Sequence, residues 1–298
     1  MLIPMGVTGI DLARRFSQRF KFGLIRRAFY MADYVDWKDV LKEALPFQAQ
    51  RDLDPPSIRI LGEEDGFSLY QVGDINLYLP SSVDFHGGLP VAYREIFIEK
   101  VYEGGRCLVR PGDWVIDAGA CEGFFSLYAL RKGAKVIAFE PIPELAEALK
   151  KTLQSYIREG RAKVFAFGLG EKDEELEMFL FKDGVMSSTF SEDKVKHWHE
   201  GWLEYERLRL KVVSIDGLFK NGLLPPVSFI KADVEGYEKK LLLGASEVVR
   251  RFKPRLSICT YHLPDDYIEI PKIVEGFGLK YKIKLKPHMG TIGVMHAW

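Results

Sequence analysis

Two glycines and two carboxylates between residues 113 and 141 have the types and spacing of a nucleoside-binding turn. Gly119 and Gly123 follow an apolar run that ends at Asp117, and a second apolar run stops at Glu140. The glycines let a ligand approach the backbone, and the helix after them offers unpaired N–H groups. A carboxylate at the end of the second strand can accept hydrogen bonds from both hydroxyls of a ribose. The segment therefore predicts an adenosine-type ligand.

The spacing of the turn narrows the ligand further. The pattern D-x-G-x-x-x-G differs from G-x-G-x-x-G, which holds the pyrophosphate of a dinucleotide. An acid before the first glycine suits a ligand with a cationic amino-acid end, so the predicted cofactor is S-adenosylmethionine. A nicotinamide-dependent oxidoreductase is the weaker alternative. The residues expected to contact the cofactor are Asp117, Gly119, Ala120, Glu122, Gly123, Phe124, Glu140, Pro141, Gly168 and Asp233.

Two acids of the turn have two interpretations each. Asp117 either holds the turn or faces the ammonium group of the ligand. Glu122 either stabilises the first turn of the following helix through the helix dipole or contacts the ligand.

A second group of charged residues lies in the segment FIKADVEGYE, residues 229–238. A buried parallel strand should be a nearly continuous apolar run, and Lys231 interrupts it. Because a buried unpaired charge is costly, Lys231 must be paired or lie at the open end. Lys231 and Asp233 share a face, which predicts a charge pair at the mouth of the site. The alternative is a structural salt bridge before a capped helix.

His262 ends the next predicted strand. Its imidazole can accept a proton near neutral pH, and Asp233 ends the strand expected beside it. We therefore predict four catalytic residues: either Asp233 or His262 is the base, and Lys231 and Glu235 orient them.

Two further groups carry less information. His197 and His199 lack nearby partners for a metal site, so no metal is predicted and they are expected to form a lid or substrate wall. Residues 187–189, Ser-Ser-Thr, either contact substrate or simply turn the chain.

Strand and helix patterns alternate from Gly112 onward, which predicts a mostly parallel, seven-stranded α/β sheet with helices on both faces. Ligands of such sheets bind beyond the carboxyl ends of the strands. The expected strands are 114–117, 135–140, 163–167, 227–233, 255–261, 279–285 and 291–296, and the expected helices are 124–131, 143–158, 237–250 and 265–277.

The other segments divide the chain into three predicted parts: a helical extension over 1–56, a small β segment with a lead-in helix over 57–110, and the core over 111–298. The small segment should hold strands 58–61, 67–72 and 75–79 and a helix over 90–109. An insertion over 171–221 should hold a strand at 177–181, a polar loop at 182–191 and a helix at 195–205.

Residues 10–30 predict a basic amphipathic helix. Such a helix can dock on an anionic membrane, or it can pack on the core, and we favour packing because the apolar face continues without basic residues at Trp37, Val40 and Leu41.

The composition predicts neither a nucleic-acid partner nor a disulfide framework. The 42 basic and 42 acidic residues cancel, and the three cysteines are unclustered, which favours a reducing cytoplasm. The first residues lack the features of a signal peptide. Few asparagines beside abundant Lys and Glu resemble a heat-adapted composition.

Taken together, the motifs resemble the FkbM-type family of S-adenosylmethionine-dependent methyltransferases. The resemblance covers roughly residues 90–298 and implies a Rossmann-like class I methyltransferase fold. It also implies an enzyme that methylates a hydroxyl of a sugar, glycan, lipid or secondary metabolite. A non-catalytic methyltransferase-like binding protein is the alternative. The motifs are Val115–Gly123, Ala138–Pro141, Ser187-Ser188, Val213–Asp216, Ile230–Glu238, Lys253-Pro254 and His262.

Overall fold

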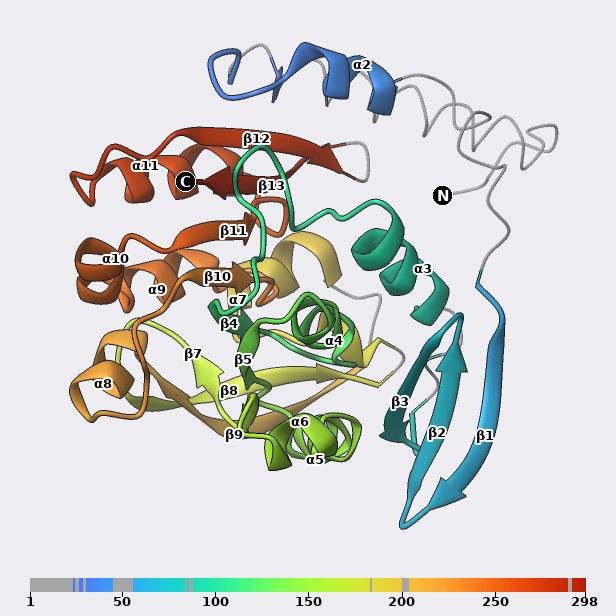
Figure 1. The fold of residues 1–298 in the computed structure, drawn as a ribbon. Helices are drawn as coiled ribbons and strands as arrows, with labels where there is room; N and C mark the ends of the chain where they lie inside the picture. Colours follow the sequence, from blue (N-terminus) through green and yellow to red (C-terminus); the bar gives the residue numbers. More distant parts are fainter. Residues whose placement is uncertain are drawn as a thin grey trace, which may run out of the picture.

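A seven-stranded sheet forms the centre of the protein, with strand order β12-β13-β11-β10-β4-β5-β6 (Figure 1). The structure is a computed structural model that describes Leu24, Arg27, Ala28 and residues 31–44, 56–83, 85, 88–182, 184–199, 204–288 and 291–298. Strand β13 runs antiparallel to both neighbours, and the other six strands are parallel to one another. The strands are β4 (Trp114–Ala118), β5 (Lys135–Phe139), β6 (Ala162–Phe165), β10 (Phe229–Ala232), β11 (Arg255–Cys259), β12 (Ile283–His288) and β13 (Thr291–Ala297).

Helices cover both faces of this sheet, as the alternating patterns predict. Successive strand residues point to opposite sides, so Val115 packs in one hydrophobic cluster and Ile116 in the other. The first face carries α3 (Leu89–Tyr93), η2 (Arg94–Ile98), α4 (Phe124–Arg131), α5 (Pro143–Thr152) and α6 (Gln154–Arg158). The second carries α8 (Ile215–Lys220), α9 (Glu238–Leu243), α10 (Ser246–Phe252) and α11 (Asp266–Glu275). The predicted fold class is confirmed: the sheet is mostly parallel and seven-stranded, with helices on both faces in a Rossmann-like arrangement.

The order of the strands places a switch point between β4 and β10. From β4 the chain continues outward to β5 and β6, and it then returns to add β10 on the other side of β4. Connections that leave in opposite directions open a crevice at the carboxyl ends of these strands. The turn after β4 and the loop after β10 therefore meet there.

A small antiparallel sheet precedes the core and shares its hydrophobic cluster. It consists of β1 (Ile58–Glu64), β2 (Phe67–Val72) and β3 (Ile75–Pro80), and it lies to the right of α5 in Figure 1. The predicted helix over 90–109 is wrong beyond Ile98. Lys100 has a φ of 50°, a left-handed conformation that a right-handed helix cannot contain. The division into three parts stays a prediction.

The insertion after β6 forms a second three-stranded sheet of order β7-β9-β8. Its strands are β7 (Gly168–Leu169), β8 (Glu174–Phe181) and β9 (Tyr205–Val213). The predicted helix over 195–205 is wrong at Tyr205, which begins β9. Before it lie α7 (Glu192–Lys194) and the π-helix η4 (Val195–His199), and residues 200–203 lie outside the described residues. Leu208, Leu210 and Val212 alternate with charged residues, which is the period of a strand, but no strand was predicted there.

The N-terminal extension is described mainly by α2 (Trp37–Ala44), which lies along β12 (Figure 1). Leu24, Ala28 and Val35 are buried against the core, while most of residues 10–30 lie outside the described residues. In the part of the chain that the structure describes, every helix is too short or too polar to cross a bilayer.

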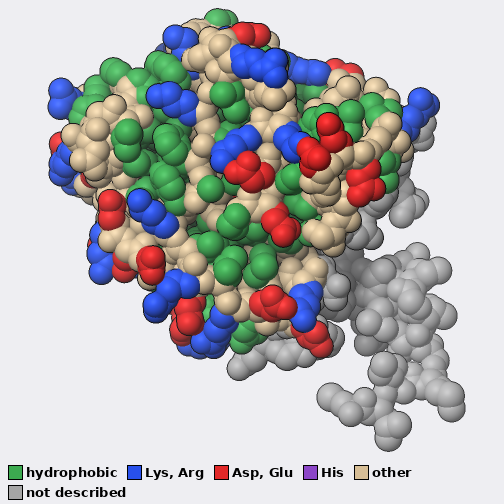
Figure 2. All heavy atoms as spheres, turned by 90° about the horizontal axis from the view of Figure 1, so that it is seen from below, with side chains coloured by type: hydrophobic (Ala, Val, Ile, Leu, Met, Phe, Trp, Pro, Cys, Tyr) green, Lys and Arg blue, Asp and Glu red, His purple; other side chains and the backbone are tan. Residues whose placement is uncertain are grey.

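Charged side chains on the face shown in Figure 2 are interspersed. Lysine and arginine lie next to aspartate and glutamate between hydrophobic patches, in line with the formal net charge of zero.

Candidate active site

The turn after β4 touches the loop after β10, and this contact requires a glycine. Gly119 has a φ of +70°, and a Cβ atom there would lie 1.9 Å from the carbonyl oxygen of Asp233. Only a residue without a side chain allows this approach. The contact joins the two loops at the switch point.

Lys231 holds the same turn from behind. Its Nζ atom lies 3.0 Å from Oδ1 of Asp117 and donates to the carbonyl oxygens of Gly119 (2.7 Å) and Ala118 (3.2 Å). Burial alone would lower the pKa of Lys231, but the charges of Asp117 and Asp233 outweigh it and raise the pKa.

The predicted pair of Lys231 with Asp233 is therefore replaced by a pair of Lys231 with Asp117. The reason is strand register, because Lys231 lies directly opposite Asp117 on the neighbouring strand. Asp117 also accepts from Oγ of Ser126 at 2.7 Å. Of its two predicted roles, the geometry matches the one in which Asp117 holds the turn.

Glu140 follows β5 directly and is buried at the edge of the crevice. Its carboxylate accepts from the backbone N–H groups of Cys121 (2.9 Å) and Ile142 (3.0 Å). Burial raises the pKa of Glu140 to about 7, and these two hydrogen bonds oppose the rise only in part. A group poised to ionise near neutral pH thus lies beside the glycine turn.

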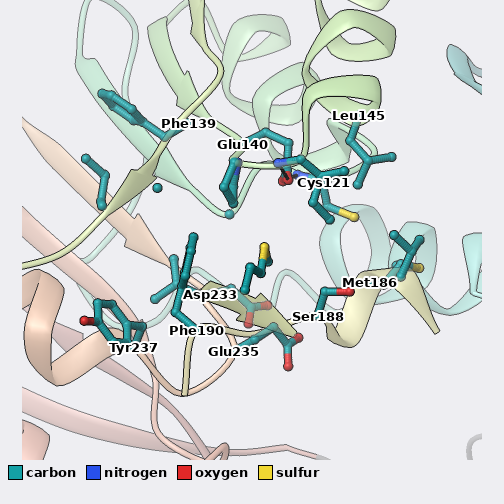
Figure 3. Close-up of a pocket in the computed structure, with 18 residues that line it drawn as sticks. Cys121, Phe139, Glu140, Leu145, Met186, Ser188, Phe190, Asp233, Glu235 and Tyr237 are labelled. Carbon is teal, nitrogen blue, oxygen red and sulfur yellow. Dashed lines mark hydrogen bonds between the residues drawn. The ribbon is translucent and has the colours of Figure 1, made fainter. Parts of the chain in front are cut away.

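A cavity of about 60 Å³ lies between these loops (Figure 3), enough for a few water molecules. The turn after β4, the end of β5 and the loop after β10 form its walls, and residues 185–190 of the insertion close it. Met186, Ser188 and Phe190 are the insertion side chains labelled in Figure 3, across the cavity from Cys121 and Glu140.

Not all of the predicted cofactor residues reach this cavity. Gly119, Glu140, Pro141, Gly168 and Asp233 line it. The other predicted cofactor residues, all of them described by the structure, do not line the cavity: Asp117, Ala120, Glu122, Gly123 and Phe124. Burial raises the pKa of Glu122, which is buried and does not line the cavity.

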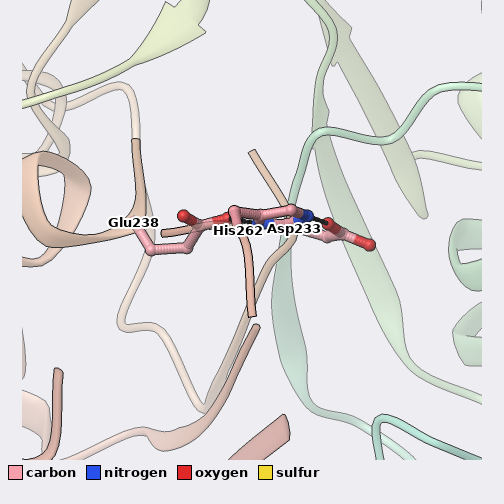
Figure 4. Close-up of side chains that lie close together, drawn as sticks. All are labelled: Asp233, Glu238 and His262. Atoms are coloured by element: carbon pink, nitrogen blue, oxygen red, sulfur yellow. Dashed lines mark hydrogen bonds and ion pairs between the residues drawn. The ribbon is translucent and has the colours of Figure 1, made fainter. Parts of the chain in front are cut away.

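The predicted catalytic residues are brought together in part. Asp233 and Glu235 line the cavity, whereas His262 lies behind them. The Nε2 atom of His262 is 3.3 Å from Oδ1 of Asp233 and 3.4 Å from Oε2 of Glu235. Figure 4 shows the imidazole between the carboxylates of Asp233 and Glu238.

Glu238 is a site residue that the sequence analysis missed. Oε1 lies 2.8 Å from Nδ1 of His262 and accepts from the N–H of Val234 at 2.9 Å, and Oε2 accepts from the N–H of Gly236 at 3.0 Å. The signal was present, since an acid near a helix start often accepts backbone N–H groups. The contact of Glu238 with His262, however, could be found only from the three-dimensional structure.

Asp233, Glu238 and His262 could also hold a metal ion, because their ligand atoms lie within 4.8 Å of one another. Both oxygens of Glu238, however, already accept from N–H donors. The three side chains therefore fit a hydrogen-bonded chain of residues better than a set of metal ligands.

Tyr102 is a second missed residue, contributed by the segment before the core. Its hydroxyl donates to Oδ2 of Asp233 at 2.5 Å, and its ring lies 5.3 Å from Nζ of Lys231. Burial would raise the pKa of Asp233, but the charges of His262 and Lys231 and this hydrogen bond lower it. Asp233 is therefore an ionised carboxylate with several partners.

The insertion is fastened to the loop after β10. Lys194 forms an ion pair with Glu235 and donates to the carbonyl of Ser187 at 3.1 Å, and the hydroxyl of Thr189 donates to the carbonyl of Glu235. Burial lowers the pKa of Lys194 to about 8. Ser188 lines the cavity, and His197 is exposed on η4. The side chain of His199 lies outside the described residues, so the wall role of this pair stays a prediction.

Comparison with known sequences identifies the family. Residues 117–281, more than half of the chain, match the family described as Methyltransferase FkbM domain. The chain belongs to the FkbM methyltransferase family. Among its relatives are methyltransferase sdnD of Sordaria araneosa, 30% identical over 179 residues, and 31-O-demethyl-FK506 methyltransferase FkbM of Streptomyces tacrolimicus, 26% identical over 178 residues. Each match covers 52% of this chain and 68% of the relative.

Other matches span smaller shares of larger proteins. AMB antimetabolite synthetase AmbE of Pseudomonas aeruginosa is 37% identical over 101 residues, which are 33% of this chain and only 4% of AmbE. The crystal structure of methyltransferase FkbM from Methylobacillus flagellatus KT has a TM-score of 0.49 at 20% identity, covering 69% of this chain and 48% of that one.

Proposed function

We propose that this FkbM-family protein transfers the methyl group of S-adenosylmethionine to a hydroxyl oxygen. The observation that carries the proposal is the cavity lined by Gly119, Glu140, Asp233 and Glu235, with the imidazole of His262 directly behind the last two carboxylates. A hydroxyl must lose its proton as it is methylated, and a positioned base contributes about 10²- to 10⁴-fold to such a step.

The residues around the cavity fit the cofactor. Glu140 directly follows β5 and keeps lone pairs that can accept hydrogen bonds from the two ribose hydroxyls. An apolar wall for the adenine ring of the cofactor is provided by Phe139, Ile142 and Leu145. Because Gly119 has no side chain, the cofactor can approach its backbone closely. When bound, the cofactor supplies an electrophilic methyl group.

Each predicted catalytic residue then has a stated task. Lys231 holds the Gly119 turn in place, Asp233 and Glu235 face the acceptor side, and His262 lies within reach of both. Alignment of the acceptor oxygen with the methyl carbon supplies the larger part of the rate, about 7 kcal/mol or more.

The acceptor class is proposed as a sugar, glycan, lipid or secondary metabolite with a free hydroxyl. The name of 31-O-demethyl-FK506 methyltransferase states methylation at an oxygen, which supports the same atom here. A carboxylic acid acceptor is disfavoured, because the carboxylates of Asp233 and Glu235 line the cavity and would repel its charge.

Calorimetry with S-adenosylhomocysteine tests the cofactor assignment. The wild type should bind at micromolar affinity, and Glu140→Ala should bind about 10- to 150-fold more weakly, since charge-assisted hydrogen bonds are lost. Equal affinity of the variant, or tighter binding of NAD, contradicts the assignment.

Transfer of a radiolabelled methyl group tests the acceptor atom. A panel of alcohols, amines and carboxylic acids of similar size should be labelled among the alcohols alone. Labelled amines contradict O-methylation, and cofactor binding without labelling of any member supports the non-catalytic alternative.

A further inference from the structure

We infer that Tyr102 is a positioning residue: its hydroxyl fixes the Oδ2 atom of Asp233, and this oxygen accepts first the hydrogen bond and then the proton of the acceptor hydroxyl. The inference rests on the proposed function and deepens it, because it assigns the base that the sequence left open. It also gives a role to a residue that lies before the family match, which begins at residue 117.

The Oδ2 atom is the oxygen of Asp233 that a ligand can reach. Asp233 lines the cavity (Figure 3), and its side chain is 19% exposed. Its Oδ1 atom, however, is buried and lies 3.3 Å from Nε2 of His262. A hydrogen bond from the cavity must therefore go to Oδ2, the same atom that accepts from Tyr102 at 2.5 Å. A carboxylate oxygen has two lone pairs, so one of them remains for the ligand.

The ring of Tyr102 is held firmly enough to set the direction of this bond. It is 7% exposed, packs edge-on against Phe125 with ring centroids 5.3 Å apart, and lies 5.3 Å from Nζ of Lys231. Burial and the charge of Asp233 raise the pKa of Tyr102 well above its usual value. The hydroxyl is therefore always a donor to Asp233.

The segment that carries Tyr102 is anchored at the next residue. Glu103 is buried, and its carboxylate accepts from the N–H of Val109 and from the hydroxyl of Tyr128, both at 2.7 Å. The same carboxylate pairs with Lys132 at 2.6 Å. These contacts hold the backbone beside Tyr102, so its hydroxyl is positioned before any ligand binds.

The charges around Asp233 favour a neutral donor. Burial raises the pKa of Asp233, but nearby cations and the hydroxyl of Tyr102 outweigh it and lower this pKa. The cations are His262, Lys231 and Lys194. Burial and the charge of Asp233 raise the pKa values of two further neighbours, Cys259 and Tyr261, which stay neutral. Because cations already balance its charge, Asp233 gains less from the ammonium group of the cofactor than an unpaired carboxylate would.

The proton transfer that follows is balanced. The acceptor oxygen forms a bond to the methyl carbon while the methyl–sulfur bond breaks and its electron pair stays on sulfur. The hydroxyl proton moves to Oδ2 of Asp233 and passes to solvent after the product leaves. A carboxylate of lowered pKa suffices as the base, because an oxygen that carries both its proton and a new methyl group is a strong acid.

Carbon NMR of the full chain with ¹³C-labelled aspartate carboxyls tests the hydrogen bond without any ligand, and Asp233→Asn assigns the signal. A hydrogen bond to the ionised form of a carboxyl lowers its pKa, so Tyr102→Phe should move the titration midpoint of Asp233 to higher pH. Tyr128→Phe is the matched control. It removes a tyrosine hydroxyl from the carboxylate of Glu103 in the same segment and should leave this midpoint unchanged. An unchanged midpoint in folded Tyr102→Phe overturns the inference.

Turnover and cofactor binding are measured separately. With an alcohol labelled by the wild type, Tyr102→Phe should lower kcat about tenfold or more with little change in S-adenosylhomocysteine affinity. Tyr128→Phe should leave both unchanged. In an Asp233→Asn background, Tyr102→Phe should lower kcat no further, because the carboxylate that receives the proton is already absent.

The contrary results are distinct. Undiminished kcat in Tyr102→Phe, or an equal further loss in the Asp233→Asn background, overturns the positioning role. A loss of S-adenosylhomocysteine affinity as large as the loss of kcat assigns Asp233 to the cofactor and also overturns it. If the wild type itself binds no S-adenosylhomocysteine, the proposed function fails, and the inference fails with it even where the midpoint of Asp233 moves.

Discussion

Lys231 and Asp117 form an ion pair across two neighbouring strands, with Nζ and Oδ1 separated by 3.0 Å and side chains that are 4% and 0% exposed. The pair lies directly behind the glycine turn, and the same ammonium group binds two carbonyls of that turn. A charge that from its sequence position alone suggested catalysis is thus part of the scaffold.

Lys231→Met should destabilise the fold by about 3–5 kcal/mol, because the carboxylate of Asp117 would remain buried without its partner. Urea unfolding measures the loss. Adding Asp117→Asn to Lys231→Met should recover part of it, since the uncompensated charge is removed. Equal destabilisation by the single and double variants would show that the pair itself contributes little.

The elements of the core could be predicted because their signals are local. Apolar runs such as 135–140, turn glycines and alternating helices define the parallel sheet, and the predicted strands agree with the structure within a few residues. Strand β9 was harder to predict. Most of its side chains are exposed on both faces, and its pairing with β8, which the sequence does not show, makes it a strand.

Glu140 should make both stability and cofactor binding depend on pH. Its pKa in the fold is about 7 and its ordinary value is 4.5, so the folded state binds the proton more tightly. Protonated Glu140 therefore adds on the order of 3 kcal/mol to the free energy of unfolding. This contribution is fully present below pH 4.5 and is lost as the pH rises through 7. Unfolding in urea between pH 5 and 8 should show this fall.

The same carboxylate must be ionised to accept two ribose hydroxyls well. Affinity for S-adenosylhomocysteine should therefore rise from pH 6 to pH 8. Glu140→Gln is the control: it should flatten this rise and also remove the stability change between pH 5 and 8. A variant that keeps both slopes assigns them to other groups.

Gly119→Ala should abolish cofactor binding or folding, because the new Cβ atom would meet the backbone of Asp233 at 1.9 Å. Gly112→Ala is a matched control. Gly112 also has a positive φ, of +82°, but nothing lies within 4 Å of its Cβ position. Gly112→Ala should lower the free energy of unfolding only by the cost of a left-handed backbone at a non-glycine residue, about 1–2 kcal/mol. Thermal melts and calorimetry distinguish the two, and equal losses would mean that the close approach is unimportant.

Lys194 should control how readily residues 185–191 open. The cavity of about 60 Å³ is far smaller than the 300–1,000 Å³ typical of ligand sites, so we expect this segment to move when the proposed cofactor enters. Lys194→Met removes the ion pair with Glu235 and should speed hydrogen exchange of the segment about tenfold or more.

The neighbouring Lys196 provides the comparison for this experiment. It is exposed and forms an ion pair with the exposed Glu192 one helical turn away, so Lys196→Met should leave exchange unchanged. Because the pKa of Lys194 is about 8, opening of the wild type should increase from pH 7 to pH 9 beyond the intrinsic exchange rate. Identical exchange in both variants argues against a fastening role.

The site was predictable where residues follow directly from strand ends. Asp233, Glu235 and Glu140 reach the cavity for that reason. Tyr102 and Glu238 were missed because their roles depend on distance across the fold: Tyr102 is 131 residues from the carboxylate it binds. Spacing within a motif carries no information about such a contact.

The position of β13 has a consequence for how the protein can be divided. The family match ends at residue 281, whereas β13 begins at Thr291 and pairs directly with β11 inside the sheet. An expression fragment cut at the family boundaries would leave β11, four of whose five residues are buried, as a bare apolar edge. Such edges recruit strands from other molecules, so that fragment would assemble into aggregates rather than remain a monomer. It would also lack Tyr102, and even a well-dispersed fragment would hold Asp233 differently.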